Sequence, residues 1–350
     1  MTLYGQFDAG VYSLKNIAAT DKTGTVYGDG ATFSNVLGFK GIEDIGGGLS
    51  AGFDFQTDVQ TNNGGSNAAG MFRRQANGNI ASKTLGELKL GLTTNPIIAT
   101  NGALMPAGAA GNSVATAASA AIGYADFYTK NAVTYTSPSV MGVVAQIQKG
   151  LSNDTENSSN GSMSAYSLAY VNGPLEARYA AQDRKQATDA IGATAPNGSA
   201  TAANSFNKKS SIFGLKYTMG AWSAGVARLS SEGQLGYTYN GVTKNTSGSV
   251  AKRTGNQVGV SYTNGAMTYG YARTNAEGSS LSTVQARYAL SKRTNLIGTY
   301  GVADNKGTLV GFNPLSFNTG TSPSTIINST ATPTTGEKQS GFGVALTHSF

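Results

Sequence analysis

The sequence predicts an all-β fold: a closed, sixteen-stranded antiparallel barrel that spans a membrane. Three observations support this prediction: a glycine-rich composition with few charges, apolar and polar residues alternating with period two, and connections that alternate between short and long. Glycine occupies 47 of 350 positions, and charged residues make up only 12%. Mean hydropathy is -0.20, and no stretch approaches the roughly 18 apolar residues that a spanning helix needs. The 17 Tyr, 13 Phe and one Trp recur along the chain, which argues against disorder.

Period-two alternation marks the strands, because successive side chains of a strand point to opposite faces of a sheet. In the first such stretch, one face carries Leu3, Phe7, Ala9 and Val11, and the other carries Gln6 and Asp8. The pattern returns in residues 49–56, 175–179, 213–217 and 284–288. A soluble sandwich would alternate in the same way, so the alternation alone does not identify the solvent on each face.

The connections between these strands indicate the architecture. Short turns are expected at residues 43–48, 83–86, 137–142, 172–174, 219–221, 264–266 and 291–293. Mostly longer polar loops are expected at residues 14–32, 61–70, 95–128, 151–163, 183–208, 231–253, 275–280 and 303–337. An even number of strands, with short turns at one rim and long loops at the other, is typical of bacterial outer-membrane barrels. Closure also removes exposed strand edges. We expect one such domain over residues 1–350.

The chain contains few residues of the types that support catalysis or bind a metal. There is no cysteine, which excludes disulfides, thiolate metal sites and a cysteine nucleophile. The single histidine, His348, alternates with apolar residues near the C-terminus, on the face expected to meet lipid. We therefore expect no enzyme, no metal and no cofactor. The 25 basic residues are scattered, so we expect no nucleic-acid partner despite the net charge of +7.

The start of the sequence is compatible with two locations. No charged and apolar leader precedes the first strand pattern. Either the protein stays in the cytoplasm, or a signal peptide has been removed and a methionine placed at the mature end. The barrel pattern favours the second interpretation and the bacterial outer membrane.

If the apolar face meets lipid, a set of charged side chains lines the interior. Its expected members are Lys40, Lys89, Lys130, Arg178, Lys216, Arg287, Asp8, Asp54, Glu176 and at least one of Arg73 and Arg74. These charges form either a merely hydrated wall or an electrostatic filter that favours anions. We favour the filter for Lys40, Arg73, Arg74 and Lys130. We favour the hydrated wall for Arg178, Lys216 and Arg287, and we place Arg287 away from loop 95–128.

Loop 95–128 is the longest in the first half of the chain and the least polar. Residues 101–121 are mostly small, with Leu104 and Met105, and the only charge in the loop is Asp126. An apolar segment of this length is hard to leave in water, so we expect it to fold into the lumen and narrow the pore. The alternative is an extracellular flap or an oligomer latch.

Several motifs resemble those of the general porins of Gram-negative β-proteobacteria. Residues 2–10 are similar to the first strand of that family, and the run Leu-Gly-Phe-Lys-Gly-Ile-Glu-Asp-Ile-Gly-Gly-Gly-Leu at 37–49 is the most specific match. Further matches lie at residues 72–76, 131–138, 290–294 and 348–350. The motifs span the chain from end to end, so the resemblance covers one whole domain.

The resemblance implies a sixteen-stranded homotrimer that passes small hydrophilic solutes and ions by diffusion, among outer-membrane lipid and lipopolysaccharide. It also implies that the third loop folds inward against basic wall residues. By motif, Lys40 matches the strand-two lysine, Arg74 the arginine before Gln-Ala, and Asp126 the acidic end of loop three. Members often carry arginine at the positions of Val36 and Leu92, so we expect only a mild anion preference.

Two other functions stay open at this stage. One is an enzyme or adhesin that the barrel merely anchors, and the other is a solute-specific channel for organic acids, including aromatic ones. The C-terminus adds a separate expectation: Phe342, Val344, Leu346, His348 and Phe350 form one outward stripe. This stripe resembles the recognition signal of outer-membrane assembly, with Phe350 as its terminal residue.

Overall fold

The computed structural model describes residues 1–16, 23–30, 32–66, 70–109, 127–153, 155, 158, 161–185, 208–234, 237–239, 242–244, 250–306, 312, 315 and 336–350. Its regular structure within these residues is almost entirely β. The wall strands are β1 (Thr2–Lys15), β2 (Thr23–Asp29), β3 (Val36–Gly46), β4 (Leu49–Asp58), β5 (Gln75–Ser82), β6 (Gly86–Thr94), β7 (Tyr128–Thr136), β8 (Val143–Gly150), β9 (Met163–Asn172), β10 (Leu175–Arg184), β11 (Lys208–Met219), β12 (Trp222–Gln234), β15 (Val250–Asn264), β16 (Met267–Ala276), β17 (Ser279–Ala289), β18 (Thr294–Asp304) and β19 (Lys338–Ser349). A short hairpin, β13 (Tyr237–Tyr239) with β14 (Val242–Lys244), stands apart from the wall.

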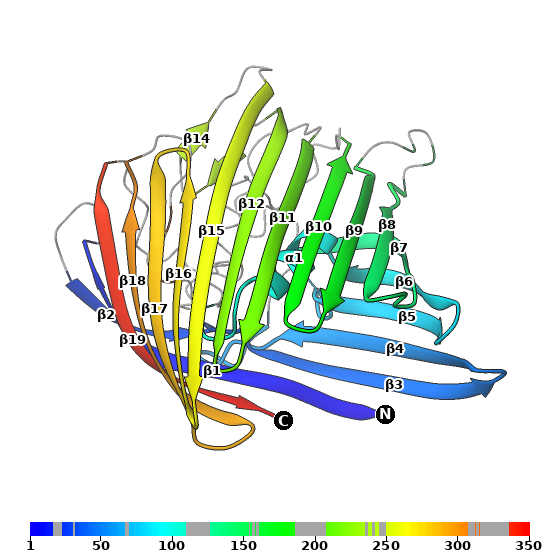
Figure 1. Cartoon of the computed structure of the whole chain (residues 1–350), viewed down its shortest axis with the longest axis horizontal. Coiled ribbons are helices and arrows are strands. Elements are labelled where there is room, and N and C mark those ends of the chain that lie inside the picture. Colours follow the sequence, from blue (N-terminus) through cyan, green and yellow to red (C-terminus); the bar gives the residue numbers. More distant parts are fainter. Residues whose placement is uncertain are drawn as a thin grey trace.

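The sheet closes into a barrel of sixteen positions (Figure 1). Each wall strand pairs antiparallel with its neighbours, and β19 pairs with β1 to complete the circle. The sheet has seventeen strands, but β2 and β3 share one position. β2 pairs with residues 9–15 of β1 and β3 with residues 2–6. The predicted sixteen-stranded antiparallel barrel is therefore confirmed.

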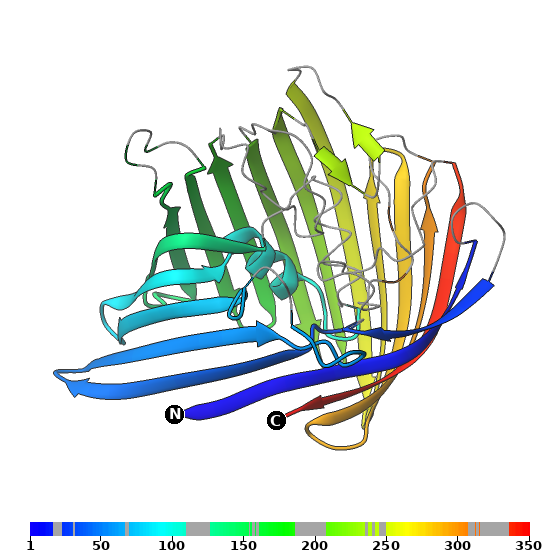
Figure 2. The ribbon, with the colours of Figure 1, turned by 180° about the vertical axis from the view of Figure 1, so that it is seen from behind.

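The seven connections predicted as short turns lie together at one rim, with both chain ends near it (Figures 1 and 2). All seven predicted short turns join adjacent strands at the expected places. The loop predicted at residues 14–32 needs correction, because among its described residues 14–15 belong to β1 and 23–29 form β2, which folds back along β1. The stretch 275–280 is also mostly strand, with only residues 277–278 between β16 and β17.

The two faces of the wall differ as the alternation predicts. On β11, Phe213, Leu215 and Tyr217 are exposed, while Ile212, the residue before Phe213, is fully buried. On β19, Phe342 and Val344 are exposed and the intervening residues face inward. Large apolar side chains thus cover the outside, and polar side chains line the inside. This inverted distribution suits a wall with lipid outside and water within.

The one helix of the described residues, α1 (Pro96–Leu104), begins the segment that follows β6. Asn95 caps it by accepting a hydrogen bond of 2.9 Å from the backbone N–H of Ile97, and Pro96 occupies the first turn, where its missing N–H costs nothing. The buried Asn95 amide also donates to Gln182 of β10 at 2.8 Å. No described helix has the length and apolar character to cross a membrane.

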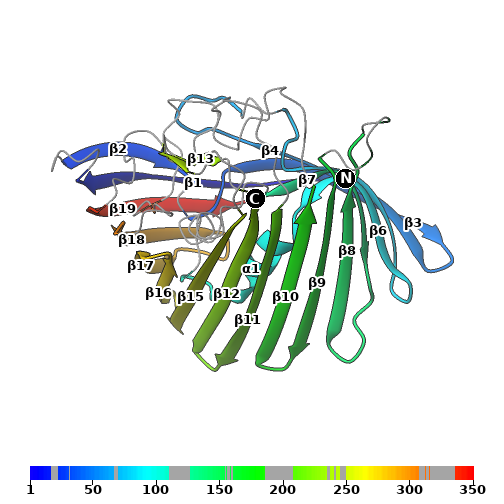
Figure 3. The same ribbon diagram turned by 90° about the horizontal axis from the view of Figure 1, so that it is seen from above.

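Helix α1 lies against the inner face of β9 to β12 (Figures 2 and 3). Ile97, Leu104, Met105 and Ala109 form one apolar cluster with wall residues of β10, β11, β12 and β16. Residues 110–126, half of the predicted constriction loop, lie outside the described residues. The inward folding of the whole loop therefore stays a prediction.

Glycines of the wall make room for this segment. A Cβ atom at Gly225 would lie 2.1 Å from the carbonyl oxygen of Leu104, and one at Gly270 would lie 2.1 Å from that of Gly108. Gly214 and Gly259 likewise face Leu104 and Pro106. These positions lie on β11, β12, β15 and β16, so they form a continuous track across four strands, which we call the glycine track. Residues 104–109 rest on it.

Candidate functional site

The first charged cluster of the inner wall is built on β1, β3 and β4. Lys40 pairs in register with Asp54 and with Thr2, and its Nζ lies 4.9 Å from the centre of the Tyr4 ring. The Tyr4 hydroxyl donates to Asp54 and accepts from Gln56 at 3.3 Å. The structure thus places Lys40 and Asp54 on the inner wall, on the same face as Tyr4.

Arg73 and Arg74 extend this cluster just before β5. The Arg74 guanidinium donates to Gln56 at 3.0 Å and to Asp58 at 2.9 Å, and Arg73 forms an ion pair with the other oxygen of Asp58. Arg74 also lies 5.4 Å from the centre of the Tyr128 ring. Asp58 therefore orients both guanidinium groups and offsets part of their charge. The whole cluster contains three basic and two acidic side chains.

The second charged cluster lies on β10 and β11, beside α1. Glu176 and Lys216 are direct register partners, with Lys216 Nζ 2.7 Å from Glu176 Oε1. Arg178 binds the other oxygen of Glu176 at 2.9 Å. Lys216 also donates to the backbone carbonyl of Ala103 at 2.8 Å. From the sequence, Arg178 and Lys216 are expected only to line a hydrated wall, but in the structure Lys216 bonds directly to the helix.

Asp8 and Arg287 belong to a different environment. Asp8 is fully buried, and its Oδ2 accepts backbone hydrogen bonds of 2.8 Å from Thr32 and from Phe33. It therefore holds the link between β2 and β3 against the wall. The Arg287 guanidinium lies 5.5 Å from the centre of the Phe33 ring.

The expected separation of Arg287 from loop 95–128 does not hold. Arg287 pairs in register with Thr268, and a Cβ atom at Gly108 would lie 2.8 Å from Thr268 Cγ2. The described end of the loop segment thus reaches the strand next to Arg287. The reason is that residues 104–109 cross four strands along the glycine track, which no local pattern reveals.

The remaining predicted residues are not gathered with these clusters. Lys89 lies on β6 with its Nζ 3.5 Å from Glu87. Lys130 is exposed and falls in a register irregularity of β7, between the paired residues Thr129 and Ala132. Asp126 lies outside the described residues. The structure therefore brings together Lys40, Arg73 and Arg74, but it does not add Lys130 to them.

Sequence reasoning missed a third basic group, formed by Arg184, Lys208 and Arg253. Arg184 and Lys208 are register partners at the loop ends of β10 and β11, and Lys208 and Arg253 are buried. The sequence places Lys208 at the end of a polar loop, although the residue continues the alternation of Ser210 and Ile212. The sequence also gives no direct sign that Gln56 and Asp58 belong to the first cluster. The only signal is that they follow Asp54 at every second position of one strand, which places all three on the same face.

The C-terminal strand completes the wall at its seam. The backbone N–H and carbonyl of Phe350 exchange hydrogen bonds of 3.1 Å with Gly5 of β1. A Cβ atom at Gly5 would lie 2.4 Å from the Phe350 ring, so the ring covers this glycine. His348 stays on the outer surface, where its Nδ1 lies 2.9 Å from the Thr294 hydroxyl. Among the described residues, no three His, Cys, Asp or Glu side chains gather to hold a metal.

Comparison with known proteins agrees with this architecture. The family model of Gram-negative porins matches residues 1–308. Among solved structures, the anion-selective porin from Comamonas acidovorans is similar, with a TM-score of 0.71 and 21% identity over 100% of this chain and 99% of that chain. OmpF of Salmonella typhi, in complex with daunomycin, gives a TM-score of 0.68 and 16% identity over 100% and 97%. OmpT of Vibrio cholerae gives 0.65 and 16% over 100% and 97%.

No curated protein sequence matches the chain. The assignment therefore rests on the family model, which covers most of the chain, while the structural similarities support the fold. The same family and fold point to a channel rather than to an enzyme. The chain belongs to the Gram-negative porin family, and it is a β-barrel porin of the bacterial outer membrane.

Proposed function

We propose that this porin is a trimer that passes small hydrophilic solutes and ions by diffusion, with a mild preference for anions. The observation that carries the preference is the composition of the two charged clusters. Lys40, Arg73 and Arg74 face Asp54 and Asp58, and Arg178 and Lys216 face Glu176. Each cluster therefore has one basic side chain in excess. A small excess favours anions without excluding cations.

A narrow passage is needed for these charges to act. At an effective dielectric constant of about 20, a unit charge 4 Å away contributes about 4 kcal/mol, against about 1 kcal/mol in bulk water. Salt at physiological strength screens exposed charges beyond about 8 Å. We propose that loop 95–128 narrows the pore between the two clusters. The packing of Ile97, Leu104 and Met105 against the wall supports this proposal.

An aromatic cluster on the outer surface of β3 and β4 supports the proposal of a trimer. Phe39, Phe53, Phe55 and Phe72 form an aromatic cluster there, with ring centres 5.2–6.4 Å apart. An apolar cluster of this kind suits burial between subunits, because aromatic side chains bury a large apolar area. We propose that this face contacts the next subunit. The mass of the detergent-solubilised protein, measured by light scattering, tests the trimer, and a monomeric mass contradicts it.

Planar-bilayer recording tests the channel. The purified protein should produce stepwise ion currents, and the zero-current potential in a tenfold salt gradient should have the sign of a weak anion preference. A protein that folds and inserts but conducts no ions would contradict the porin proposal. It would favour an anchored enzyme or adhesin instead. A cation preference would contradict only the assignment of the basic clusters.

A further inference from the structure

The outer surface of β11 to β17 changes character partway along the strands. Toward the short-turn rim, outward residues in register are aromatic, with Trp222 beside Tyr262 and Tyr262 beside Tyr269. The next row contains Tyr217, Ala224, Val260 and Tyr271, and the row after it contains Leu215, Val226, Val258 and, on β16, Arg273. The next row contains Phe213, Arg228, Asn256 and Asn275. Basic groups therefore begin in the row of Val258, at Arg273, and amide groups join them in the row of Arg228.

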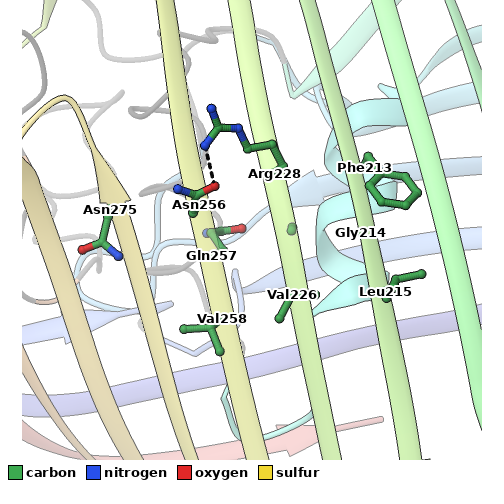
Figure 4. Close-up of a pocket in the computed structure, with 10 residues that line it drawn as sticks. Phe213, Gly214, Leu215, Val226, Arg228, Asn256, Gln257, Val258 and Asn275 are labelled. Carbon is green, nitrogen blue, oxygen red and sulfur yellow. Dashed lines mark hydrogen bonds between the residues drawn. The ribbon is translucent and has the colours of Figure 1, made fainter.

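Arg228 is exposed on this outer face, next to a shallow depression of about 400 Å³ (Figure 4). Its Nη1 donates to Asn256 Oδ1 at 2.8 Å. Phe213, Val226 and Val258 also line the depression, and Figure 4 shows them beside and below the guanidinium. A cation and two amides thus border an apolar floor.

A second arginine, Arg273, points outward on β16, which is separated from β12 by β15. Arg273 pairs in register with Val258, and its guanidinium donates to Asn275 and to Ser282, each at 3.0 Å. Within the part of the chain that the structure describes, the acceptors of Arg228 and Arg273 are neutral oxygens rather than carboxylates. Each guanidinium has five N–H donors, so donors remain for an anionic ligand.

The acidic residues of this face lie closer to the loops. Glu232 pairs in register with Lys209 and Lys252, two rows beyond Arg228. Glu277 accepts a hydrogen bond from the backbone N–H of Thr254 at 2.9 Å. These two carboxylates therefore do not neutralise the positive charge in the register row that contains Arg228.

The position of Arg228 along the membrane normal makes an oppositely charged partner necessary. Arg228 lies six positions after Trp222, which corresponds to about 20 Å along the strand and about 15 Å along the membrane normal at the usual barrel tilt. The apolar band of such barrels is about 25 Å tall. Arg228 therefore begins within the outer part of the band, and its long side chain can reach the headgroup layer. A charge there is costly unless it meets an opposite charge.

We propose that Arg228 and Arg273, together with Asn256 and Asn275, bind the phosphate group of a lipid in the outer leaflet. Guanidinium groups bind phosphate through paired N–H donors, and amide N–H groups add further bonds. The apolar floor accommodates the start of the acyl chains. The proposal depends on the barrel lying in the outer membrane and not on what passes through its pore.

Native mass spectrometry of the full-length protein in non-ionic detergent tests this site. The probe is lipid A, which carries two phosphates, compared with the same lipid after both phosphates are removed. The test variant is Arg228→Met/Arg273→Met, because methionine on the lipid face does not endanger folding. The matched control is Lys292→Met/Arg293→Met, which also removes two positive charges, from an exposed short turn at the opposite rim.

The wild type and the control should retain the phosphorylated lipid in preference to the dephosphorylated one. The test variant should bind the phosphorylated lipid at least roughly tenfold more weakly, since two charge-assisted contacts are lost. Equal retention by the test variant and the control would overturn the proposal. So would equal binding of both lipids by the wild type, or full displacement by millimolar inorganic phosphate, which would indicate a site for the free anion. Single-channel conductance should be unchanged in the test variant.

Discussion

Lys216 of β11 donates a hydrogen bond of 2.8 Å to the backbone carbonyl of Ala103 in α1, although 113 residues separate the two. The same ammonium group lies 2.7 Å from Glu176 of β10. One side chain thus connects the wall, its carboxylate partner and the helix. It is the polar counterpart of the apolar packing on the glycine track.

Replacing Lys216 with methionine should loosen α1 from the wall. Hydrogen bonds to charged groups contribute about 1.5–3 kcal/mol, so the population with a displaced helix should rise at least about tenfold. Single-channel records should then show more frequent transitions between conductance levels. Lys89→Met is the matched control, because Lys89 also lies on the inner wall and pairs with an acid, Glu87. If both variants flicker equally, the contact with Ala103 does not hold the helix.

The charge on Asp58 should set the ion preference in opposition to Arg74. Asp58→Asn leaves Arg73 and Arg74 without their acidic partner and should shift the zero-current potential toward anions. Arg74→Glu changes the local charge by two units and should shift it toward cations, by a larger amount. Both shifts should shrink at high salt, because screening shortens the reach of each charge.

Lys89→Glu makes the same change of charge as Arg74→Glu on another part of the inner wall. Its effect on the zero-current potential in the same salt gradient should be much smaller. Equal shifts for Arg74→Glu and Lys89→Glu would mean that the charges of the pore act collectively. The assignment of Arg74 to a constriction would then be wrong.

Adding one methyl group to the glycine track should destabilise the packing of residues 104–109 against the wall. In Gly225→Ala, the new Cβ would lie 2.1 Å from the Leu104 carbonyl oxygen, so residues 104–109 must move. Overpacking of this kind costs about 1–3 kcal/mol. The temperature at which the barrel unfolds on a heated gel should fall. Gly298→Ala is the control, since a Cβ atom there meets nothing within 4 Å; an equal loss would implicate strand propensity instead.

Phe350 should be needed for assembly rather than for conduction. Phe350→Asp should leave unfolded protein in the periplasm, because the residue ends the outward stripe of β19 and pairs with Gly5 at the seam. Trp222→Asp removes an exposed aromatic residue from the same rim and should preserve most of the surface level. Immunoblots of outer-membrane fractions compare the two variants. Normal surface levels of Phe350→Asp would refute the assembly signal.

Much of the barrel follows from local pattern. Alternation places Phe213 and Leu215 outside and Lys216 inside, and glycine-rich turns mark the short rim. The sequence does not predict the fold-back of β2 along β1, because residues 14–32 have the polar composition of a loop. Helix α1 had a readable signal in Asn95 and Pro96, an N-cap residue followed by proline. The small residues around it pointed to a flexible loop instead.

The sequence by itself determined most of the strands, their two faces, the sixteen positions of the barrel and the inward position of most wall charges. Only the tertiary structure decided which of these charges meet. Asp58 lies between Arg73 and Arg74, and Lys216 reaches Ala103, because of strand register and a loop that crosses four strands. Alternation is a property of neighbouring residues, and it can be read along the chain. These contacts join residues from 15 to 113 positions apart in sequence, and their distances exist only once the strands have paired and the loop has packed against the wall.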